Sequence, residues 1–237
     1  MNKKIKSLVL AAVMGLSLTT VAVVPTTVEA ASAGAAETLI GGAVAYAYVS
    51  TAFNKMDNSK EGQEQSLARA KKQTGYLEDS AAQARVQRIM KTLEASPSVK
   101  RLYVVYANPS DDFNAFATVG RVMSVNKGAL DLLDDDELAY VMAHEISHGE
   151  HKDIVNGLKK QVGLSTAVSL AAGGGGNAAI LSNIAGNYME NQVFTMGQEK
   201  AADELGFKIL SESPYNVGAA AASMAGARDT NRGFSLS

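Results

Sequence analysis

The sequence predicts an α+β protein that is mostly helical, with a small antiparallel sheet beside one helix that carries histidines. Apolar residues recur at helical spacing in several long segments, whereas strand-like patterning is confined to the stretch 102–126. The chain has 237 residues, of which 46% are hydrophobic and 19% charged. This length suits one globular domain or at most two small ones, and the apolar content argues against a disordered chain.

Charge and cysteine content exclude several classes of protein. Lys and Arg number 22 against 24 Asp and Glu, so the net charge is −2 and no basic field exists to bind nucleic acid. The chain has no cysteine, which excludes disulfides, thiolate zinc sites, cysteine nucleophiles and a lipidated cysteine. Its 3 histidines all lie between residues 144 and 151, and this clustering directs attention to one segment.

Residues 1–30 have the composition of a secretory signal peptide. Lysines occupy the start, an apolar run extends from Leu8 to about Val24, and small residues lead to Ala30. We therefore expect cleavage after Ala30, with Ala33 as a second exit. The alternative is an uncleaved membrane anchor, for which the apolar run is short. The expected location is the periplasm or cell envelope, or the medium outside the cell.

The rest of the chain divides into residues 31–74, an N-terminal apolar and helical segment, and residues 75–237, the main domain. Within the first segment, residues 39–53 are apolar but too few to cross a bilayer comfortably. We interpret them as a core helix or packing segment rather than a membrane contact. We find no internal repeat and no linker that divides the chain further.

The main domain begins with one predicted helix and a small predicted sheet. Apolar residues recur at helical spacing over residues 80–93. Residues 102–106 are β-branched and aromatic, which predicts a strand. Two further short strands are expected at 116–117 and 121–125, on either side of a Thr-Val-Gly connection. Because these strands follow one another closely, we expect them to form an antiparallel sheet.

Two capping boxes mark the starts of the next long helices. Asp134 with Glu137 predicts the first, whose acidic initial turn suits the helix dipole and which should run to about His151. Thr195 with Gln198 repeats the pattern and predicts the second. Each box fixes where its helix begins, and therefore which residues share its faces.

Between and after these helices the chain is apolar or rich in small residues. Residues 154–171 should be helical, and Gly173–Gly176 then interrupts the helix as a loop or hinge. The apolar segments 161–171 and 178–185 either form a hairpin that covers the histidine helix or contact a membrane peripherally. The helix that Thr195 opens should extend to about Leu210, and residues 216–226 should form a short helix of small residues.

The histidine helix carries the motif HExxH as His144, Glu145 and His148. Residues four apart lie on one face of a helix, so both imidazoles can reach a single Zn²⁺. Glu145 lies beside them and can take a proton from water that the metal activates. The alternative is a solvated helix that happens to carry two histidines. The capped amphipathic helix favours a catalytic zinc site.

Such a site needs a third protein ligand. His151 is too far along the helix axis from His144, about 10 Å at 1.5 Å per residue, and we expect it at the rim or surface. Glu199 and Asp203 lie four residues apart on another predicted helix, so Glu199 could bind the metal and Asp203 could orient a liganding histidine. From spacing alone, this pair is equally consistent with a solvated acidic face.

The chain resembles the gluzincin zinc peptidases of the HtpX, CaaX-prenyl-protease and BepA kind. In that family, HExxH is followed about fifty residues later by Glu-x-x-Ala-Asp, as Glu199–Asp203 follows His144–His148 here. The resemblance covers residues 75 to 215. It implies one Zn²⁺ per chain held by His144, His148 and Glu199, with Glu145 as general base. Asp203 would then contact a liganding histidine rather than the metal.

Other stretches carry the same resemblance. Residues 124–130 and 136–139 are similar to the family, and residues 114–117 resemble the family's edge strand near the substrate cleft. An edge strand can receive an extended peptide by strand addition. The resemblance therefore implies substrate binding at Asn114, Ala115, Phe116 and Ala117.

The chain departs from the family at two places. Thr195 and Met196 stand where the family often has Ser-Arg, and the family's later Thr-His-Pro segment has no counterpart before Ser237. The group that would stabilise an oxyanion is therefore not given by the resemblance. Candidates from the residues present are Tyr215, Arg228 and Arg232.

Taken together, the residues and the resemblance predict a zinc-dependent endopeptidase of the cell envelope. Its expected substrates are proteins or peptides, in particular misfolded or envelope proteins. The alternative is a zinc-containing binding or chaperone-like envelope protein with little turnover. The two differ in whether replacement of Glu145 abolishes hydrolysis.

Overall fold

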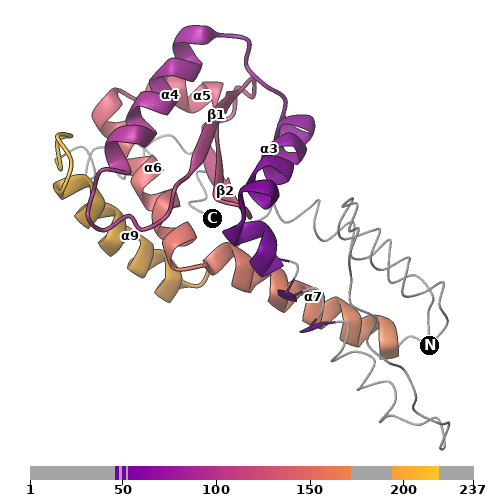
Figure 1. The fold of residues 1–237 in the computed structure, drawn as a ribbon. Helices are drawn as coiled ribbons and strands as arrows, with labels where there is room; N and C mark the ends of the chain where they lie inside the picture. Colours follow the sequence, from indigo (N-terminus) through magenta and orange to yellow (C-terminus); the bar gives the residue numbers. More distant parts are fainter. Residues whose placement is uncertain (1–45, 48–49, 52, 172–193, 219–237) are drawn as a thin grey trace, which may run out of the picture. The chain divides into compact units, whose positions relative to one another are not determined.

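The structure is a computed structural model that describes residues 46–47, 50–51, 53–171 and 194–218. The chain divides into two compact units, one of residues 1–54 and 157–190 and one of residues 55–156 and 191–237. The second unit holds the sheet and the helices that surround it (Figure 1). The predicted class, a mostly helical α+β fold with one small sheet, is confirmed.

The sheet has three strands in the order β1-β3-β2, where β1 is Val104–Asn108, β2 is Ala115–Thr118 and β3 is Val122–Asn126. β2 pairs with β3 antiparallel, as expected, but β1 pairs with β3 in parallel. The expectation of a fully antiparallel sheet was therefore wrong. The chain passes from β1 to the far edge at β2 and then turns back into the middle, so β3 runs in the direction of β1.

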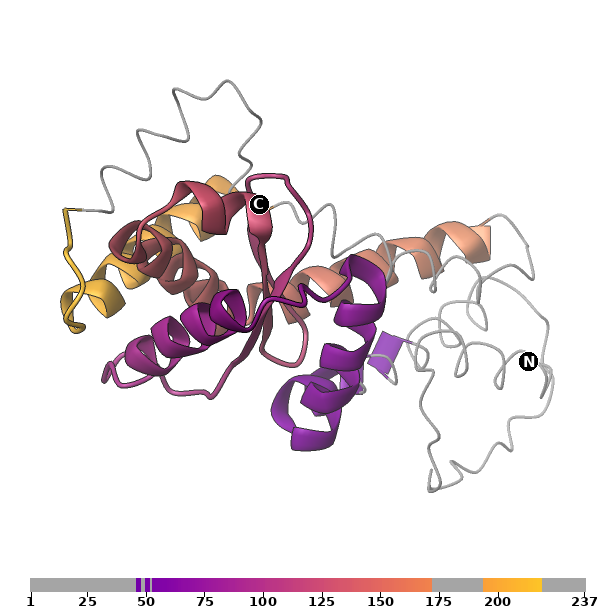
Figure 2. The ribbon, with the colours of Figure 1, turned by 90° about the horizontal axis from the view of Figure 1, so that it is seen from above.

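Helices cover both faces of this sheet. α3 (Lys60–Thr74) lies against one face, whereas α4 (Ser80–Leu93) and α6 (Asp135–Glu150) lie against the other (Figures 1 and 2). Every residue of β2 and β3 is consequently buried. The core forms where α4 and α6 meet the sheet, around Ile89, Met123 and Ile146.

The outer edge of β1 is bonded to side-chain and loop groups. The Gln83 amide of α4 donates to Ala107 O at 2.9 Å and accepts from Ala107 N at 2.9 Å. Leu77 N adds a bond to the same carbonyl at 3.0 Å. β2 forms the other edge of the sheet.

α6 and α9 (Met196–Ser211) pack side by side. Both start at the predicted capping boxes, which form at Asp134 and Thr195. The helices approach closely at Gly206, where a Cβ atom would lie 3.1 Å from the backbone of His144. A glycine here therefore brings α9 against the turn of α6 that carries the first histidine.

The remaining helices fit the sequence in part. α4 and α7 (Asp153–Ala171) match the segments predicted, and α3 lies within the segment 31–74 expected to be helical. α5 (Lys127–Leu132) was not predicted; its N-cap residue, Asn126, makes no side-chain cap bond, so the usual start signal is missing.

The first unit is described only in short stretches. Residues 53–54 and 157–171 are helical, and Lys159 Nζ donates to Asn54 Oδ1 at 2.9 Å. Among the residues that the structure describes, no helix combines the length and apolarity needed to cross a bilayer. The predicted signal peptide, the loop at Gly173–Gly176, the segment 178–185 and most of 216–226 lie outside the described residues.

Candidate metal centre

The HExxH segment lies on the buried side of α6. His144, Glu145 and His148 have exposed fractions of 0%, 2% and 0%. The two imidazoles lie one turn apart with their Nε2 atoms 3.2 Å from each other. Burying two such rings side by side is unfavourable unless their polar atoms find partners.

Glu199 of α9 reaches this pair from the neighbouring helix. Its Oε2 lies 3.5 Å from His144 Nε2 and its Oε1 lies 3.9 Å from His148 Nε2. One ligand atom from each of the three residues falls within 4.8 Å of the others, a spacing that suits a shared metal ion. The structure thus brings together the two histidines and the carboxylate that the sequence singled out.

The donor set fits a divalent cation. Oε1 of Glu199 is buried and has no hydrogen-bond partner, although a buried carboxylate oxygen normally has one. It lies 3.9 Å from His148 Nε2, beyond hydrogen-bonding distance. Two histidines and one carboxylate form a catalytic type of zinc site, in which a fourth position stays open.

His144 is oriented from behind by Asp203, as the sequence suggested. Its Nδ1 lies 2.9 Å from Asp203 Oδ1, which also accepts a hydrogen bond from the Tyr140 hydroxyl at 3.2 Å. Burial lowers the pKa of His144, but its bonds to Asp203 and Glu199 outweigh burial and raise this pKa to about 10. The bond to His144 in turn lowers the pKa of Asp203, which stays an ionised acceptor.

His148 is oriented by Asp153, which the sequence analysis did not identify. Its Nδ1 lies 3.0 Å from Asp153 Oδ2, and Gln198 Nε2 donates to the other oxygen, Oδ1, at 2.9 Å. Phe194 stacks on the His148 ring, with centroids 3.9 Å apart and planes inclined by 14°. An Asp five residues beyond HExxH was the available signal, but its use depends on the turn between α6 and α7.

Glu145 is bonded to the sheet through one oxygen of its carboxylate. Its Oε2 accepts a hydrogen bond from Ala117 N of β2 at 3.0 Å. Burial raises the pKa of Glu145, while the histidines and the Ala117 N–H act in the opposite direction. A carboxyl with a raised pKa beside a metal site is suited to accept and release a proton. The edge strand therefore contacts the candidate base directly.

The other candidates lie elsewhere. His151 is exposed at the C-cap of α6, consistent with the expected surface position. Tyr215 packs against the core, and its neighbour Asn216 donates to Asp136 in the first turn of α6, at the opposite end from His148. The structure therefore does not bring Tyr215 to the candidate ligands. Arg228 and Arg232 lie outside the described residues.

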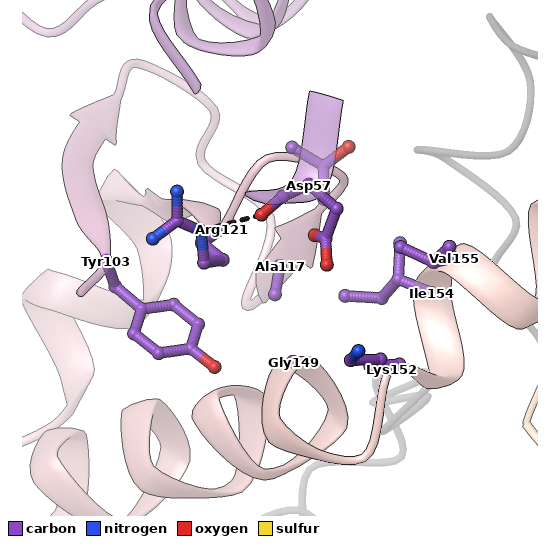
Figure 3. A pocket seen from close by; sticks show the side chains of 9 residues that line it. Asp57, Tyr103, Ala117, Arg121, Gly149, Lys152, Ile154 and Val155 are labelled. Carbon is purple, nitrogen blue, oxygen red and sulfur yellow. Dashed lines mark hydrogen bonds between the residues drawn. The ribbon is translucent and has the colours of Figure 1, made fainter. Parts of the chain in front are cut away.

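A small cavity borders the C-terminal end of α6 (Figure 3). Its lining includes Tyr103, Ala117, Gly149 and Lys152, and none of the three candidate ligands is among its lining residues. The cavity is therefore separate from the candidate metal site, although Ala117 borders both.

Buried polar contacts beside this cavity fix the end of α6. Asp57 forms an ion pair with Arg101 and accepts a bond from Arg121 Nε at its backbone oxygen, at 2.9 Å. Arg101 Nη1 donates to Gly149 O at 2.8 Å. These contacts hold the turn of α6 that directly follows His148.

Comparison with known proteins gives evidence on the site that is independent of its geometry. The model of peptidase family M48 matches residues 77–230. Three relatives, each named a protease, are a beta-barrel assembly-enhancing protease of Yersinia pestis, a protease HtpX homolog of Salinibacter ruber and the metalloprotease LoiP of Escherichia coli.

The similarity to these relatives covers part of each chain. The Yersinia pestis protein is 29% identical over 130 residues, which is 50% of this chain and 27% of that protein. The Salinibacter ruber protein is 33% identical over 133 residues, 49% of this chain and 47% of that protein. LoiP is 29% identical over 114 residues, 46% of this chain and 44% of LoiP. The chain thus spans between about a quarter and a half of the length of these relatives.

Proposed function

Because the chain belongs to peptidase family M48, a family of metalloproteases, we propose that it hydrolyses peptide bonds with one zinc ion bound between α6 and α9. The family membership confirms the resemblance and the enzyme class that the sequence predicted. The single observation that carries the proposal is the meeting of His144, His148 and Glu199 from two helices, with their ligand atoms within 4.8 Å.

In the proposed mechanism each residue has a separate task. Bound zinc supplies Lewis-acid chemistry, which polarises a carbonyl and acidifies water. Glu145 takes the proton of the attacking water and passes it to the leaving amine. The Ala117 N–H holds one oxygen of Glu145, so the other, Oε1, is the oxygen that receives the proton. Asp203 and the backbone of α6 keep the imidazole of His144 in place.

We place the substrate along the edge strand. β2 is the edge of the sheet nearer the candidate base, since Ala117 contacts Glu145 directly. An extended peptide paired with Asn114 to Ala117 would bring its backbone to the side of Glu145. Because β2 is buried and the Ala117 N–H is bonded to Glu145, this pairing requires the groups that cover the strand to move aside. Main-chain pairing reads no particular side chain, which suits unfolded or misfolded proteins as substrates.

We further propose an envelope location, with residues 1–30 as a cleaved signal peptide and residues 75–237 as the peptidase domain. The supporting observations are the basic and then apolar start of the chain and the relatives' names, one of which refers to β-barrel assembly. N-terminal sequencing of the protein recovered from the envelope tests this, since the new terminus should be Ala31, or Gly34 if the second exit is used. A terminus at Met1 would contradict cleavage.

The central experiment is the replacement of Glu145 by Gln. The variant should lose casein or peptide hydrolysis by about 10²- to 10⁴-fold, because the proton acceptor is gone, yet keep one zinc per chain. Glu204→Gln, the same change on an exposed side chain of α9, should leave both unchanged. Hydrolysis should also stop when a chelator removes the metal.

Two results would contradict the proposal. Purified protein with far less than one zinc per chain would refute the metal site. Zinc-loaded protein without chelator-sensitive hydrolysis would favour a binding or chaperone-like role, which also retains the metal.

A further inference from the structure

We propose that Asp153 is a positioning residue shared by two ligands of the zinc site: it orients His148 directly and holds the start of α9, which carries Glu199, through Gln198. This inference rests on the proposed zinc site. It adds a second point at which α6 and α9 are joined, separate from the contact of Asp203 with His144.

The first contact fixes the second histidine. Asp153 Oδ2 lies 3.0 Å from His148 Nδ1, and the Asp153 side chain is only 10% exposed. When Nδ1–H donates to this carboxylate, the neutral imidazole carries no proton on Nε2. This Nε2 atom lies 3.9 Å from Glu199 Oε1. Such a partner sets the tautomer and the direction of a liganding imidazole.

The second contact reaches the other helix. Gln198 Nε2 donates to Asp153 Oδ1 at 2.9 Å, and Gln198 Oε1 accepts from Thr195 N at 3.0 Å. Gln198 therefore serves the capping box of α9 and Asp153 at once. Because Glu199 is the next residue, a displacement of this first turn would move the candidate third ligand away from the histidines.

The backbone between α6 and α7 is shaped for this contact. Lys152 has φ of 60°, a left-handed conformation that costs a non-glycine residue about 1 kcal/mol or more. The turn brings the first residue of α7, Asp153, back to His148, five positions earlier. Phe194 stacks on the face of the His148 ring.

The alternative is that Asp153 only stabilises the start of α7, where an acidic residue interacts favourably with the helix dipole. That role predicts a loss of fold stability with no effect on the metal. The positioning role predicts weaker zinc binding even when both protein forms are fully folded.

The test measures the zinc dissociation constant of the full chain by competition with a chromophoric chelator at pH 7. Asp153→Ala should weaken zinc binding by about 10- to 100-fold, as loss of a ligand's partner usually does. Gln198→Ala should weaken it by a smaller factor. The double variant should bind no worse than Asp153→Ala within about threefold, because Gln198 acts through Asp153.

Glu204→Gln is the matched control and should bind zinc like the unmodified chain. Urea unfolding in the presence of a chelator separates the two roles, since a change in zinc affinity that exceeds the change in apo stability is not explained by helix capping. If Asp153→Ala does not fold, Asp153→Asn and Gln198→Ala carry the test; both should weaken zinc binding.

The inference is overturned if Asp153→Ala and Asp153→Asn bind zinc as tightly as the unmodified protein, in which case the proposed peptidase still stands. Additive losses in the double variant would overturn the link through Gln198. An unmodified chain that binds no zinc would overturn this inference and the proposed function together.

Discussion

Asp135, in the first turn of α6, is bonded through its carboxylate to two arginines of α4. Arg85 Nε and Arg88 Nη2 of α4 each lie 2.7 Å from its oxygens. Arg85 also donates to the backbone oxygens of Leu130 and Leu133, both at 2.7 Å. The bonds from Arg85 and Arg88 lower the pKa of Asp135 below its ordinary value. This ionised side chain thus ties the first turn of the histidine helix to α4.

We predict that this carboxylate makes the fold sensitive to acid. Because its pKa is lower in the folded chain, Asp135 stabilises the fold fully above the unfolded pKa of about 4, and this contribution disappears as pH falls through the folded pKa. Urea unfolding of Asp135→Asn and the unmodified chain should differ at pH 5 to 7, and the difference should shrink below pH 4. Asp112→Asn removes a carboxylate from an exposed residue and serves as the control. A difference that stays constant to pH 3 would refute the assignment.

At the scale of residues, the sequence predicted those site positions that follow from helix period. His144 and His148 share a face because they are four residues apart, and Glu199 and Asp203 do so for the same reason. Asp153 escaped prediction because its approach to His148 depends on the left-handed turn at Lys152, and no residue preference signals that conformation for lysine.

At the scale of elements, the contact of α6 with α9 depends on the absence of a side chain at Gly206. We predict that Gly206→Ala lowers the free energy of unfolding by about 1–3 kcal/mol and weakens zinc binding, because the new Cβ would press on the backbone of His144. Gly197→Ala is the control on the same helix. Its Cβ would meet nothing nearer than 4.0 Å, so it should be neutral or stabilising by up to about 1 kcal/mol.

Urea unfolding and zinc titration of both variants check this prediction. Equal effects of the two substitutions would mean that helix propensity, rather than the distance between α6 and α9, accounts for the change. A Gly206→Ala variant with full zinc affinity would mean that Glu199 reaches the histidines despite a shifted helix.

The elements were predicted well where local signals exist. Both capping boxes form at the residues expected, and α4 has the bounds that its apolar spacing gave. The pairing of the strands was not local: β1 and β3 are parallel because β2 lies beyond β3, and nothing in the sequence of either strand encodes that order. Short strands that are buried throughout show no alternation from which a face could be read.

At the scale of the molecule, the proposed metal joins helices that are about fifty residues apart in the sequence. We predict that chelation lowers the stability of the folded chain. At free zinc about 1,000 times the dissociation constant, binding adds about 4 kcal/mol, so its removal should lower Tm by roughly 10 °C. Glu199→Ala should contain less zinc and respond less to the chelator. A Tm that is indifferent to chelation in zinc-loaded protein would argue against a site between α6 and α9.

The two edges of the sheet differ because Gln83 bonds the backbone of one of them, β1. Its amide stands in for a neighbouring strand at Ala107, so another chain cannot pair there without first displacing it. The other edge is β2, where the Ala117 N–H is bonded to Glu145. Contact between copies through β1, a common route to aggregation, is opposed by Gln83 together with Leu77, whose N–H bonds the same Ala107 carbonyl, while Glu145 bonds the edge at β2.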